Sequence, residues 1–485
     1  MSGISANRRP SDLIVAFVIS FVLLVTSAIC GVFIAFPLLI ALVLFSGVLI
    51  ARGFSLRALC HMGWLGAKRS LPVVQVLLLI GMLTAVWIAA GTVPALVYYG
   101  TSLLSGRFFI LWAFLLTSMV SVLTGTAFGA VGTIGIALMV IARGSDAAID
   151  PVAGAIVAGA FLGDRCSPMS SSAHLVASIT RTSLYSNLRN MVVSSLWPIA
   201  ISVAFYAVLA LFYPVTLSAS PITAELPAVF NLAPVTLLPA VAMLLLAVLK
   251  VDVKLAMLVS IGMGGAIAHT LQHYPFPDIF RFILFGYQLQ QDTPLNTILL
   301  GGGLFPFAKS TLVVLISTAF AGIFAGSQAL SFLDGWLNRA RSQRQLTQST
   351  LLVSILANIF GCTQTIAIVL AGQIMDPYYG AIARKNNMQK EQANEQLALD
   401  LEDTAVVIAP LVPWNIANLI PSTILAIGPG FIPYAVYLLL LPLFASIRQH
   451  STVNNVSDDI PSDIVAQVTK SASPDETPPL KPTLK

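Results

Sequence analysis

The sequence predicts an all-α protein that crosses a membrane many times and consists of two repeats with broken helices. Of its 485 residues, 57% are hydrophobic and only 9% are charged, whereas soluble domains carry roughly 25% charged residues. Long apolar runs follow one another along the chain, and each spanning helix needs about 20 such residues. We therefore expect a polytopic membrane protein with about 11 to 13 transmembrane segments, several of them interrupted.

The candidate spans alternate with short polar loops. The run 108–141 is too long for one straight helix, because a helix rises about 1.5 Å per residue. We expect it to break near Thr124-Gly125-Thr126, since glycine tolerates unwound backbone. The clearest candidates are residues 13–30, 32–51, 71–96, 108–141, 192–212, 228–249, 253–268, 295–324, 351–375 and 423–444.

The basic residues indicate how the chain is oriented. They gather in three short loops: Arg52, Arg57, Lys68 and Arg69; Arg339, Arg341 and Arg344; and Arg384, Lys385 and Lys390. The positive-inside rule places these loops in the cytoplasm, together with the N-terminus. The net charge of +5 thus indicates no nucleic-acid partner. We expect a cytoplasmic N-terminus at residues 1–11, a membrane transporter domain at 12–446 and a disordered cytoplasmic tail at 447–485.

Two acidic motifs lie within apolar sequence, one around Asp164 and the other at Glu402-Asp403-Thr404. A carboxylate at membrane depth is costly unless it is paired, hydrated or bound to a cation, so each motif is a candidate ion or proton site. Local explanations stay open. Asp164 could be neutralised by its neighbour Arg165, and the second motif could carry first-turn charges that the helix macrodipole favours.

The acidic motifs lie at similar distances from glycine-containing breaks, which predicts an internal repeat. Gly125 precedes Asp164 by 39 positions, and Gly361 precedes Asp403 by 42. Each Asp is followed by a small residue and a proline, at Ser167-Pro168 and Ala409-Pro410. Interrupted hydrophobic segments in corresponding positions of two halves indicate the binding site of a transporter. The expected repeats cover about residues 72–213 and 296–446.

Polar side chains flank both motifs. Unwound backbone exposes carbonyl groups that can coordinate Na⁺, and hydroxyl and amide groups add further ligands. Close helix packing through Gly125 and Gly129 is an alternative reason for the small residues. The candidate substrate ligands are Thr124, Thr126, Ser167, Ser171, Thr363, Gln364 and Asn415. The candidate Na⁺ ligands are Asp164, Ser167 and Asp403.

Two other ionisable residues lie in apolar sequence. His174 is either a hydrogen-bonded structural residue or a proton carrier, because histidine titrates near neutral pH. Lys309 must pair, deprotonate or extend its ammonium group to the membrane surface. It could also occupy the place of a bound cation, or pair with Asp164 or Asp403.

These motifs resemble the NhaC family of sodium:proton antiporters, within the ion-transporter superfamily, over about residues 72–444. The segment Gly163-Asp164-Arg165-Cys166-Ser167-Pro168-Met169-Ser170 is similar to the family signature GDK-x-SP-L-S. Glu402-Asp403-Thr404 with Pro410-Leu411-Val412-Pro413-Trp414-Asn415 is similar to the signature EDT…P-L-I-P-W-N. The resemblance implies an inverted-repeat fold and a bacterial inner-membrane Na⁺/H⁺ exchanger that works by alternating access.

The chain departs from the family pattern at two places. Family members continue the first signature with Asp-Thr-Thr-Asn, where this chain has Ser171-Ser172-Ala173-His174, and Thr363-Gln364 lacks the Asp expected before the Gln. A lost carboxylate weakens Na⁺ attraction in a low-dielectric site. One hypothesis is therefore that Na⁺ binding is altered and that protons bind at His174, Asp164 or Lys309. The alternative function is proton- or sodium-coupled transport of a small organic acid or amino acid.

Other protein classes fit less well. The sequence has no HExxH, paired-histidine or GxSxG motif, so we do not expect an enzyme or a cofactor. A channel would need a continuous selectivity filter. The expected partners are Na⁺ and H⁺, or a small organic ion, and membrane lipid. A homodimer is left open.

Overall fold

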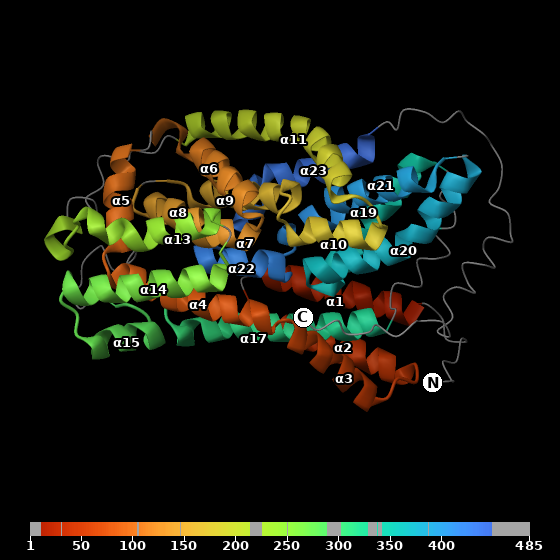
Figure 1. Ribbon diagram of the computed structural model, residues 1–485. Coiled ribbons are helices and arrows are strands. Elements are labelled where there is room, and N and C mark those ends of the chain that lie inside the picture. Colours follow the sequence, from red (N-terminus) through yellow and green to blue (C-terminus); the bar gives the residue numbers. More distant parts are fainter. Residues whose placement is uncertain are drawn as a thin grey trace.

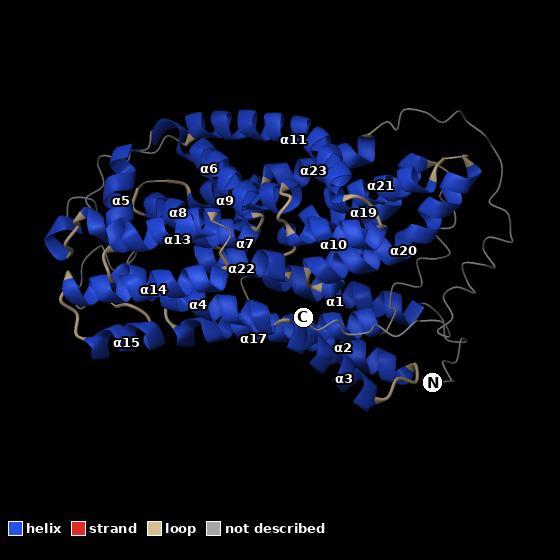
Figure 2. Cartoon of the chain, viewed as in Figure 1, coloured by secondary structure: helices blue, strands red, loops and turns tan. Residues whose placement is uncertain are grey.

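The structure is a computed structural model. It describes residues 11–30, 32–103, 106–145, 147–213, 226–249, 251–288, 302–327, 337, 342–386 and 388–448. Within these ranges the regular elements are helices, and no β-strand is present (Figure 2). The all-α prediction is therefore confirmed. Most of the expected N-terminal lead and of the expected tail lies outside the described residues.

The first five helices account for the expected N-terminal spans, with one difference. The basic segment around Arg57 and Lys68, expected as a loop, is mostly helical because Ser55 caps it and accepts a hydrogen bond from the Ala58 amide at 3.2 Å. The expected span 71–96 ends early, because Gly91 turns the chain at φ +76°. The helices are α1 (Ser11–Ile29), α2 (Ala35–Ala51), α3 (Leu56–Arg69), α4 (Leu71–Ala89) and α5 (Thr92–Leu103).

The middle of the chain is a set of mostly uninterrupted helices that pack around the rest. The longest is α11, whose 29 residues include Pro198. The expected span 295–324 is described from residue 302 onward as α17. These helices are α11 (Leu184–Phe212), α13 (Leu238–Val248), α14 (Val253–Thr270), α15 (Phe276–Phe285) and α17 (Leu304–Gly326), with short 3₁₀ turns at Gly106–Phe108 and Pro234–Leu237.

Residues 109–180 form the first interrupted unit. The expected break in the long run 108–141 is confirmed, because α6 ends at Thr124 and Gly125 adopts the left-handed conformation at φ +69°. Thr126 then caps the next helix and accepts a hydrogen bond from the Gly129 amide at 3.3 Å. The unit comprises α6 (Phe109–Thr124), α7 (Ala127–Ala130), a π-helical turn η2 (Val131–Gly135), α8 (Ile136–Arg143), α9 (Ile149–Cys166) and α10 (Ser171–Thr180).

Residues 343–425 form the second interrupted unit. Its first break lies at Cys362, at φ +48°, and Thr363 caps the following helix. The unit comprises α19 (Gln343–Gly361), α20 (Gln364–Lys385), α21 (Lys390–Leu401), a π-helical turn η5 (Glu402–Val406), a 3₁₀ turn η6 (Ala409–Leu411) and α22 (Ile416–Leu425). The expected single span 423–444 is instead divided by the turn η7 (Pro429–Tyr434), after which α23 (Val436–Ile447) closes the bundle.

The two units repeat the same backbone plan, but in a register that differs from the sequence prediction. The helices α10 and α22 each have ten residues and end at a left-handed residue, Arg181 or Ala426. Gly125 therefore corresponds to Cys362 rather than Gly361, and Pro168 to Pro413 rather than Pro410. The prediction was out of register because it counted from the acidic residues, which do not lie at equivalent backbone positions. The outer boundaries of the repeats stay a prediction.

The chain runs through the two interrupted units in opposite directions. In Figure 1, α8 and α9 lie on the left and α10 on the right, so the chain passes from left to right through the first unit. It passes from right to left through the second, from α21 on the right to α22. The half-helix α10 packs on α20, and α22 packs on η2. A half-helix of each unit therefore packs against the other unit, which is the arrangement expected of an inverted repeat.

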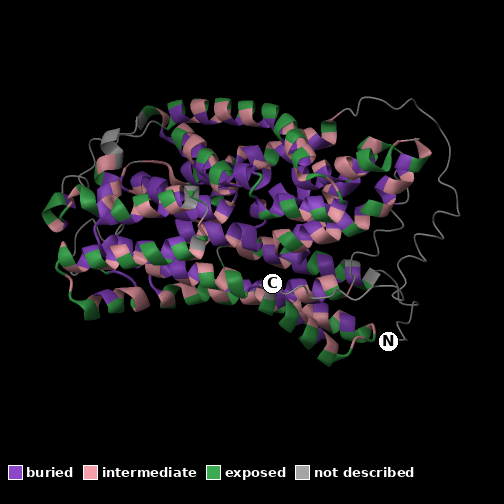
Figure 3. Ribbon diagram, in the orientation of Figure 1, coloured by how far each residue is buried: buried purple, intermediate pink, exposed green. Residues whose placement is uncertain are grey.

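Several described helices have the length and composition of membrane spans. Four qualify alone, namely α4, α11, α17 and α20, and a fifth arises if the pair 390–411 and 416–425, bent by 47°, counts as one. Shorter apolar helices such as α6 and α23 accompany them. Buried residues gather where the interrupted units meet, and exposed apolar residues follow outer helices such as α11 (Figure 3). This pattern fits a bundle surrounded by lipid rather than by water.

Candidate functional site

Asp164 lies at the meeting point of the two interrupted units. Its side chain, near the end of α9, is only 7% exposed. Its Oδ2 atom accepts hydrogen bonds from Gln364 Nε2 at 3.1 Å and from Ser172 Oγ at 3.3 Å, and the Ala127 amide is a further partner. Gln364 Nε2 also donates to the Val406 carbonyl at 3.0 Å. One carboxylate thus connects α9 with α7 and α10 of its own unit and with α20 of the other.

The helix ends around Asp164 favour a negative charge there. Ala127 and Gln364 are the first residues of α7 and α20, and Ser172 is the second residue of α10. Helix N-termini carry a partial positive charge, so a carboxylate placed among them is stabilised. Among the described residues, Asp164 has no ion-pair partner. Its charge is therefore balanced only by dipoles and hydrogen bonds, and a cation can still be attracted to it.

Arg165 does not neutralise Asp164 but pairs with Asp403 of the second unit. The guanidinium group is fully buried, and its Nη2 atom donates to the Asp403 carboxylate and to Ser194 Oγ, the latter at 2.7 Å. Its Nη1 atom donates to Ser195 Oγ and to the Met191 carbonyl, both from α11. The alternative of a local pair between residues 164 and 165 is therefore not what the structure contains.

Asp403 is held by two arginine side chains. Its second partner is Arg448, which lies just after α23. The Arg448 side chain is 24% exposed. The Arg448 Nη1 atom also lies 3.9 Å from Asp400 Oδ1. Buried charges are tolerated when they are paired in this way, so these contacts favour a structural role for Asp403. Its assignment to ion binding stays a prediction, and the contacts do not favour it.

Asp400 is a buried acidic residue that the sequence analysis missed. Its Oδ2 atom accepts hydrogen bonds from Tyr379 Oη at 2.5 Å and Thr347 Oγ1 at 2.8 Å. Its Oδ1 atom accepts one from Gln396 Nε2 at 3.0 Å. Asp400 was missed because it ends a polar helix, where acidic residues are normally exposed. Its position one turn before Thr404 was the available signal, since residues four apart share a helix face.

Glu402 is fully buried, and both of its carboxylate oxygens lack a hydrogen-bond partner among the described residues. Its side chain interacts electrostatically with Arg165, Asp164 and Asp403. An ionised carboxylate without partners is very costly in an apolar interior. Glu402 must therefore hold a proton or a cation in this arrangement. It lies in a π-helical turn, a deformation that is frequent at functional sites.

The break of the second unit is uncharged. Asn415 caps α22 by accepting a hydrogen bond from the Ala417 amide at 3.0 Å. Its Nδ2 atom donates to the carbonyl and the side-chain oxygen of Asn358, at 3.1 and 3.2 Å. The residue that corresponds to Asp164 by backbone position is Ala409. The equivalent of the first carboxylate is therefore absent here, and amide groups join α19 to the break.

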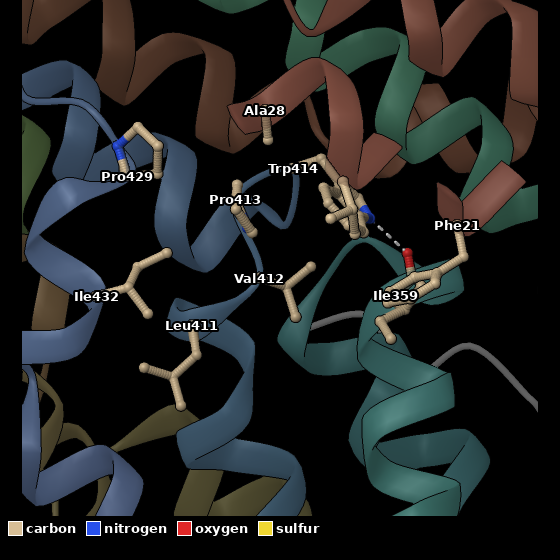
Figure 4. Close-up of a pocket in the computed structure, with 10 residues that line it drawn as sticks. Phe21, Ala28, Ile359, Leu411, Val412, Pro413, Trp414, Pro429 and Ile432 are labelled. Carbon is tan, nitrogen blue, oxygen red and sulfur yellow. Dashed lines mark hydrogen bonds between the residues drawn. The ribbon is translucent and has the colours of Figure 1, made fainter. Parts of the chain in front are cut away.

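An apolar pocket of about 330 Å³ lies beside this second break (Figure 4). Trp414 forms one wall, and its Nε1 atom donates to the Ile359 carbonyl at 2.7 Å. The lining residues are Phe21, Val25, Ala28, Ile359, Leu411, Val412, Pro413, Trp414, Pro429 and Ile432. Because these side chains offer almost no polar atoms, the pocket is unsuited to binding an ion.

Most of the predicted hydroxyl ligands satisfy backbone groups of the breaks. Ser167 Oγ donates to the Val122 carbonyl at 2.7 Å, and Thr124 Oγ1 lies 3.5 Å from the Ser121 carbonyl. Thr363 accepts a hydrogen bond from the Ile366 amide at 3.1 Å. Gln364 is the predicted ligand that touches Asp164. Ser172, the neighbour of the predicted ligand Ser171, touches Asp164 as well.

The three residues expected to share Na⁺ make separate contacts: Asp164 with Gln364 and Ser172, Ser167 with backbone, and Asp403 with arginines. Within the described residues, no group of three or more His, Cys, Asp and Glu side chains is arranged to hold a metal ion.

Three predicted residues are exposed. Ser171 and His174 lie on the open side of α10, where His174 Nε2 contacts the Pro168 carbonyl at 3.1 Å. Lys309 lies on an exposed side of α17, near its first turn. None of the three contacts Asp164 or Glu402 among the described hydrogen bonds and ion pairs.

Comparison with known proteins identifies the family. Residues 159–447, which include the acidic motifs and the second interrupted unit, match the Na⁺/H⁺ antiporter family. The chain belongs to the Na⁺/H⁺ antiporter family. The match covers more than half of the 485 residues. It also contains Asp164, Glu402 and the two residues, Gln364 and Ser172, that connect Asp164 to α20 and α10.

Relatives of this chain are named for different transported ions. The chain is 27% identical over 418 residues to an uncharacterised Na⁺/H⁺ antiporter of Haemophilus influenzae, covering 82% of this chain and 87% of the relative. It is 27% identical over 392 residues to the malate-2H⁺/Na⁺-lactate antiporter of Bacillus subtilis, covering 79% and 82%. It is 29% identical over 386 residues to the Na⁺/H⁺ antiporter NhaC of Alkalihalophilus pseudofirmus, covering 78% and 81%.

Proposed function

We propose that this chain is a secondary transporter that exchanges Na⁺ for protons by alternating access, with Asp164 as the principal ion-binding carboxylate. The observation that carries the proposal is the position of Asp164, where interrupted helices of both units meet and where no described side chain forms an ion pair with it. Family membership supports the class of transported ion. The transporter class agrees with the polytopic helical fold, and the chain is a transporter rather than an enzyme.

The balance of buried charges supports two cation-binding carboxylates. Asp403 and Asp400 lie against Arg165 and Arg448, so these four charges compensate one another. Asp164 and Glu402 are the remaining acids of the cluster. Buried charges that stay unbalanced are very unfavourable. Either Na⁺ or protons would restore neutrality, and competition between them for these carboxylates would couple the two fluxes.

The roles of the two acids differ in this proposal. Asp164 accepts several hydrogen bonds, which favour its ionised form and leave it able to bind Na⁺ with the Ser172 hydroxyl. Glu402 lacks such donors among the described residues, which favours a bound proton. Opening of the site to one side and then the other would let the ions exchange, since half-helices of one unit pack on the other unit.

The remaining predictions complete this proposal. We place the chain in the bacterial inner membrane with a cytoplasmic N-terminus, because its basic residues cluster in loops assigned to that side. We assign the membrane domain to residues 12–446. Transport of an organic acid is the second candidate, since one relative exchanges malate and lactate. It is less well supported here, because Arg165 and Arg448 are engaged in ion pairs and Lys309 lies on an exposed face.

Proton flux in proteoliposomes tests the proposal. Purified full-length chain would be reconstituted with an internal pH dye and given pulses of Na⁺, Li⁺ and K⁺, then of carboxylates and amino acids. We expect a saturable response to Na⁺ or Li⁺. We expect Asp164→Asn to reduce it to the level of empty vesicles, because the amide cannot supply the negative charge. If no cation caused proton flux but an organic solute did, the result would support the second candidate instead.

Two variants control this experiment. Asp150→Asn removes the same charge from the exposed start of the same helix, and we expect it to exchange ions normally. Glu402→Gln should still bind Na⁺, measured by stabilisation against heat, but should lose coupled proton flux. Normal exchange by Asp164→Asn, in protein as stable as the wild type, would remove Asp164 from the mechanism.

A further inference from the structure

The helix α3 packs closely along the C-terminal part of α17. A Cβ atom added at Gly66 would lie 2.1 Å from the Thr318 carbonyl oxygen and 2.9 Å from Gly322 Cα. One turn further along, Thr318 Oγ1 donates to Ser70 Oγ at 3.1 Å. At the other end, Met62 lies against Gly326, the last residue of α17. Because backbones approach this closely, α3 is fixed to the end of a candidate membrane span.

The side of α3 that faces away from α17 carries two parallel stripes, which together we call the outer face. The first stripe is apolar and follows one helical row: Leu56 (64% exposed), Cys60 and Trp64 (68% exposed). The second is basic and follows the adjacent row: Arg57, His61 and Lys68, all exposed. Residues three to four apart lie on the same side of a helix, so the apolar stripe is continuous. The basic stripe is interrupted between His61 and Lys68, where the exposed apolar side chains of Trp64 and Leu65 lie.

The outer face has no acidic counterpart on its own helix, because α3 contains no Asp or Glu. Its 14 residues are also too few to cross a membrane, since a span needs about 20. The contacts with Thr318 and Gly326 place α3 beside the last nine residues of α17, which extend about 12 Å along the span. The end of a membrane span lies near the boundary between hydrocarbon and headgroups, so we infer that α3 lies at this boundary.

We propose that the outer face of α3 is a binding surface for anionic phospholipid. Tryptophan and leucine side chains at such a boundary insert among acyl chains, while arginine and lysine side chains extend to headgroup phosphates. The basic stripe supplies the charge that matches an anionic headgroup, and the adjacent apolar stripe selects a lipid over a free anion. Because α3 packs closely on α17, a lipid bound to α3 stabilises the position of the C-terminal end of α17.

Lipid binding by purified full-length chain tests the surface directly. Delipidated protein in detergent would be titrated with phosphatidylglycerol or phosphatidylcholine, with bound lipid counted by native mass spectrometry. We expect preferential binding of phosphatidylglycerol. Each basic residue near a membrane surface contributes about fivefold to anionic-lipid affinity, so Arg57→Gln with Lys68→Gln should weaken this binding roughly 25-fold. Arg57→Lys with Lys68→Arg should restore it.

A matched control separates α3 from general positive charge. Arg344→Gln with Lys390→Gln removes two exposed basic side chains elsewhere, and its lipid preference should equal that of the wild type. Unchanged phosphatidylglycerol binding by the α3 double variant would overturn the proposal. So would an equal response to soluble glycerol phosphate, because that would indicate a free-anion site. Thermal unfolding in the absence of lipid checks that each variant is folded.

The position of the outer face can be measured separately through Cys60, which is exposed. An environment-sensitive fluorophore would be attached in a Cys30→Ser background, with Cys60→Ser as the unlabelled reference. We expect quenching by brominated acyl chains and little quenching by aqueous iodide. The reverse result would place the helix in water and contradict the proposal. These readouts measure lipid contact rather than transport, so they are independent of whether the chain exchanges Na⁺ for protons.

Discussion

The two interrupted units share a backbone but not a chemistry. Each has a left-handed residue at the first break, Gly125 or Cys362, followed by a threonine that caps the next helix. Each ends in a ten-residue half-helix capped by a polar side chain, Ser170 or Asn415. The similarity extends to buried contacts: Ser121 and Asn358 donate hydrogen bonds to the carbonyls of Ala160 and Ala405, the latter at 2.9 Å.

The difference begins one turn after these carbonyls. The first unit has Asp164, which bonds to the other unit through Gln364. The second has Ala409, and its acids lie earlier, at the π-helical turn that contains Glu402 and Asp403. The comparison teaches that the breaks and their caps are needed twice, because they position the half-helices, whereas a charge is needed at one break only. Four experiments test this comparison, beside those on Asp164.

The largest effect on stability is expected from the buried ion pair that joins the two units. Arg165→Gln leaves Asp403 with one of its two cationic partners and removes the hydrogen bonds that the guanidinium group donates to α11, so it should cost about 3 to 5 kcal/mol. Thermal unfolding in detergent measures this loss. Asp403→Asn combined with Arg165→Gln should cost less than the sum of the single variants. Additive losses would show that the two side chains do not stabilise each other.

Substitutions at the two left-handed positions should differ in how much stability they cost. Gly125→Ala strains a residue at φ +69° and places Cβ 2.5 Å from Met169 Cβ, so it should cost about 2 kcal/mol or more. Cys362→Gly relieves a positive φ of 48° but loses a buried side chain, so the two effects should largely cancel. Unfolding curves compare the variants. A greater loss from the second variant would reverse the comparison.

The two polar caps should differ in strength. Ser170→Ala removes a cap that accepts from the Ala173 amide at 3.4 Å, and a cap contributes about 1 kcal/mol. Asn415→Ala removes a cap together with its bonds to Asn358, so it should cost about 2 kcal/mol. Chemical denaturation gives both values. Equal losses would show that the amide pair adds nothing to the second break.

The smallest effects are expected at exposed residues outside the meeting point. His174→Asn and Lys309→Gln should each change the free energy of unfolding by about 0.5 kcal/mol or less. We expect both to exchange ions like the wild type in the proteoliposome assay. If the Lys309 variant lost exchange but kept its stability, Lys309 would take part in transport. The conclusion that a charge is needed only at the break near Asp164 would then be weakened.

Much of this architecture could be predicted from the sequence. Low charge and long apolar runs predict an all-α membrane protein, because the backbone in lipid must satisfy its own hydrogen bonds. The break at Thr124-Gly125-Thr126 was readable, since glycine and a capping hydroxyl determine local backbone geometry. Asp164 was also identifiable as a site candidate, because a carboxylate in apolar sequence is costly unless it is paired, hydrated or bound to a cation.

Other features depended on contacts between distant segments. Whether Arg165 pairs with Asp164 or with Asp403 is decided by the tertiary arrangement that brings the Arg165 side chain to η5, and the two partners of the actual pair lie 238 positions apart. Tertiary packing also leaves the Glu402 oxygens without partners among the described residues, and it leaves Lys309 on an exposed face of α17. Local sequence determines where helices break, because caps and left-handed residues act over a few positions. Only the tertiary structure determines which buried charges are paired, because electrostatic neutralisation depends on distance in space rather than along the chain.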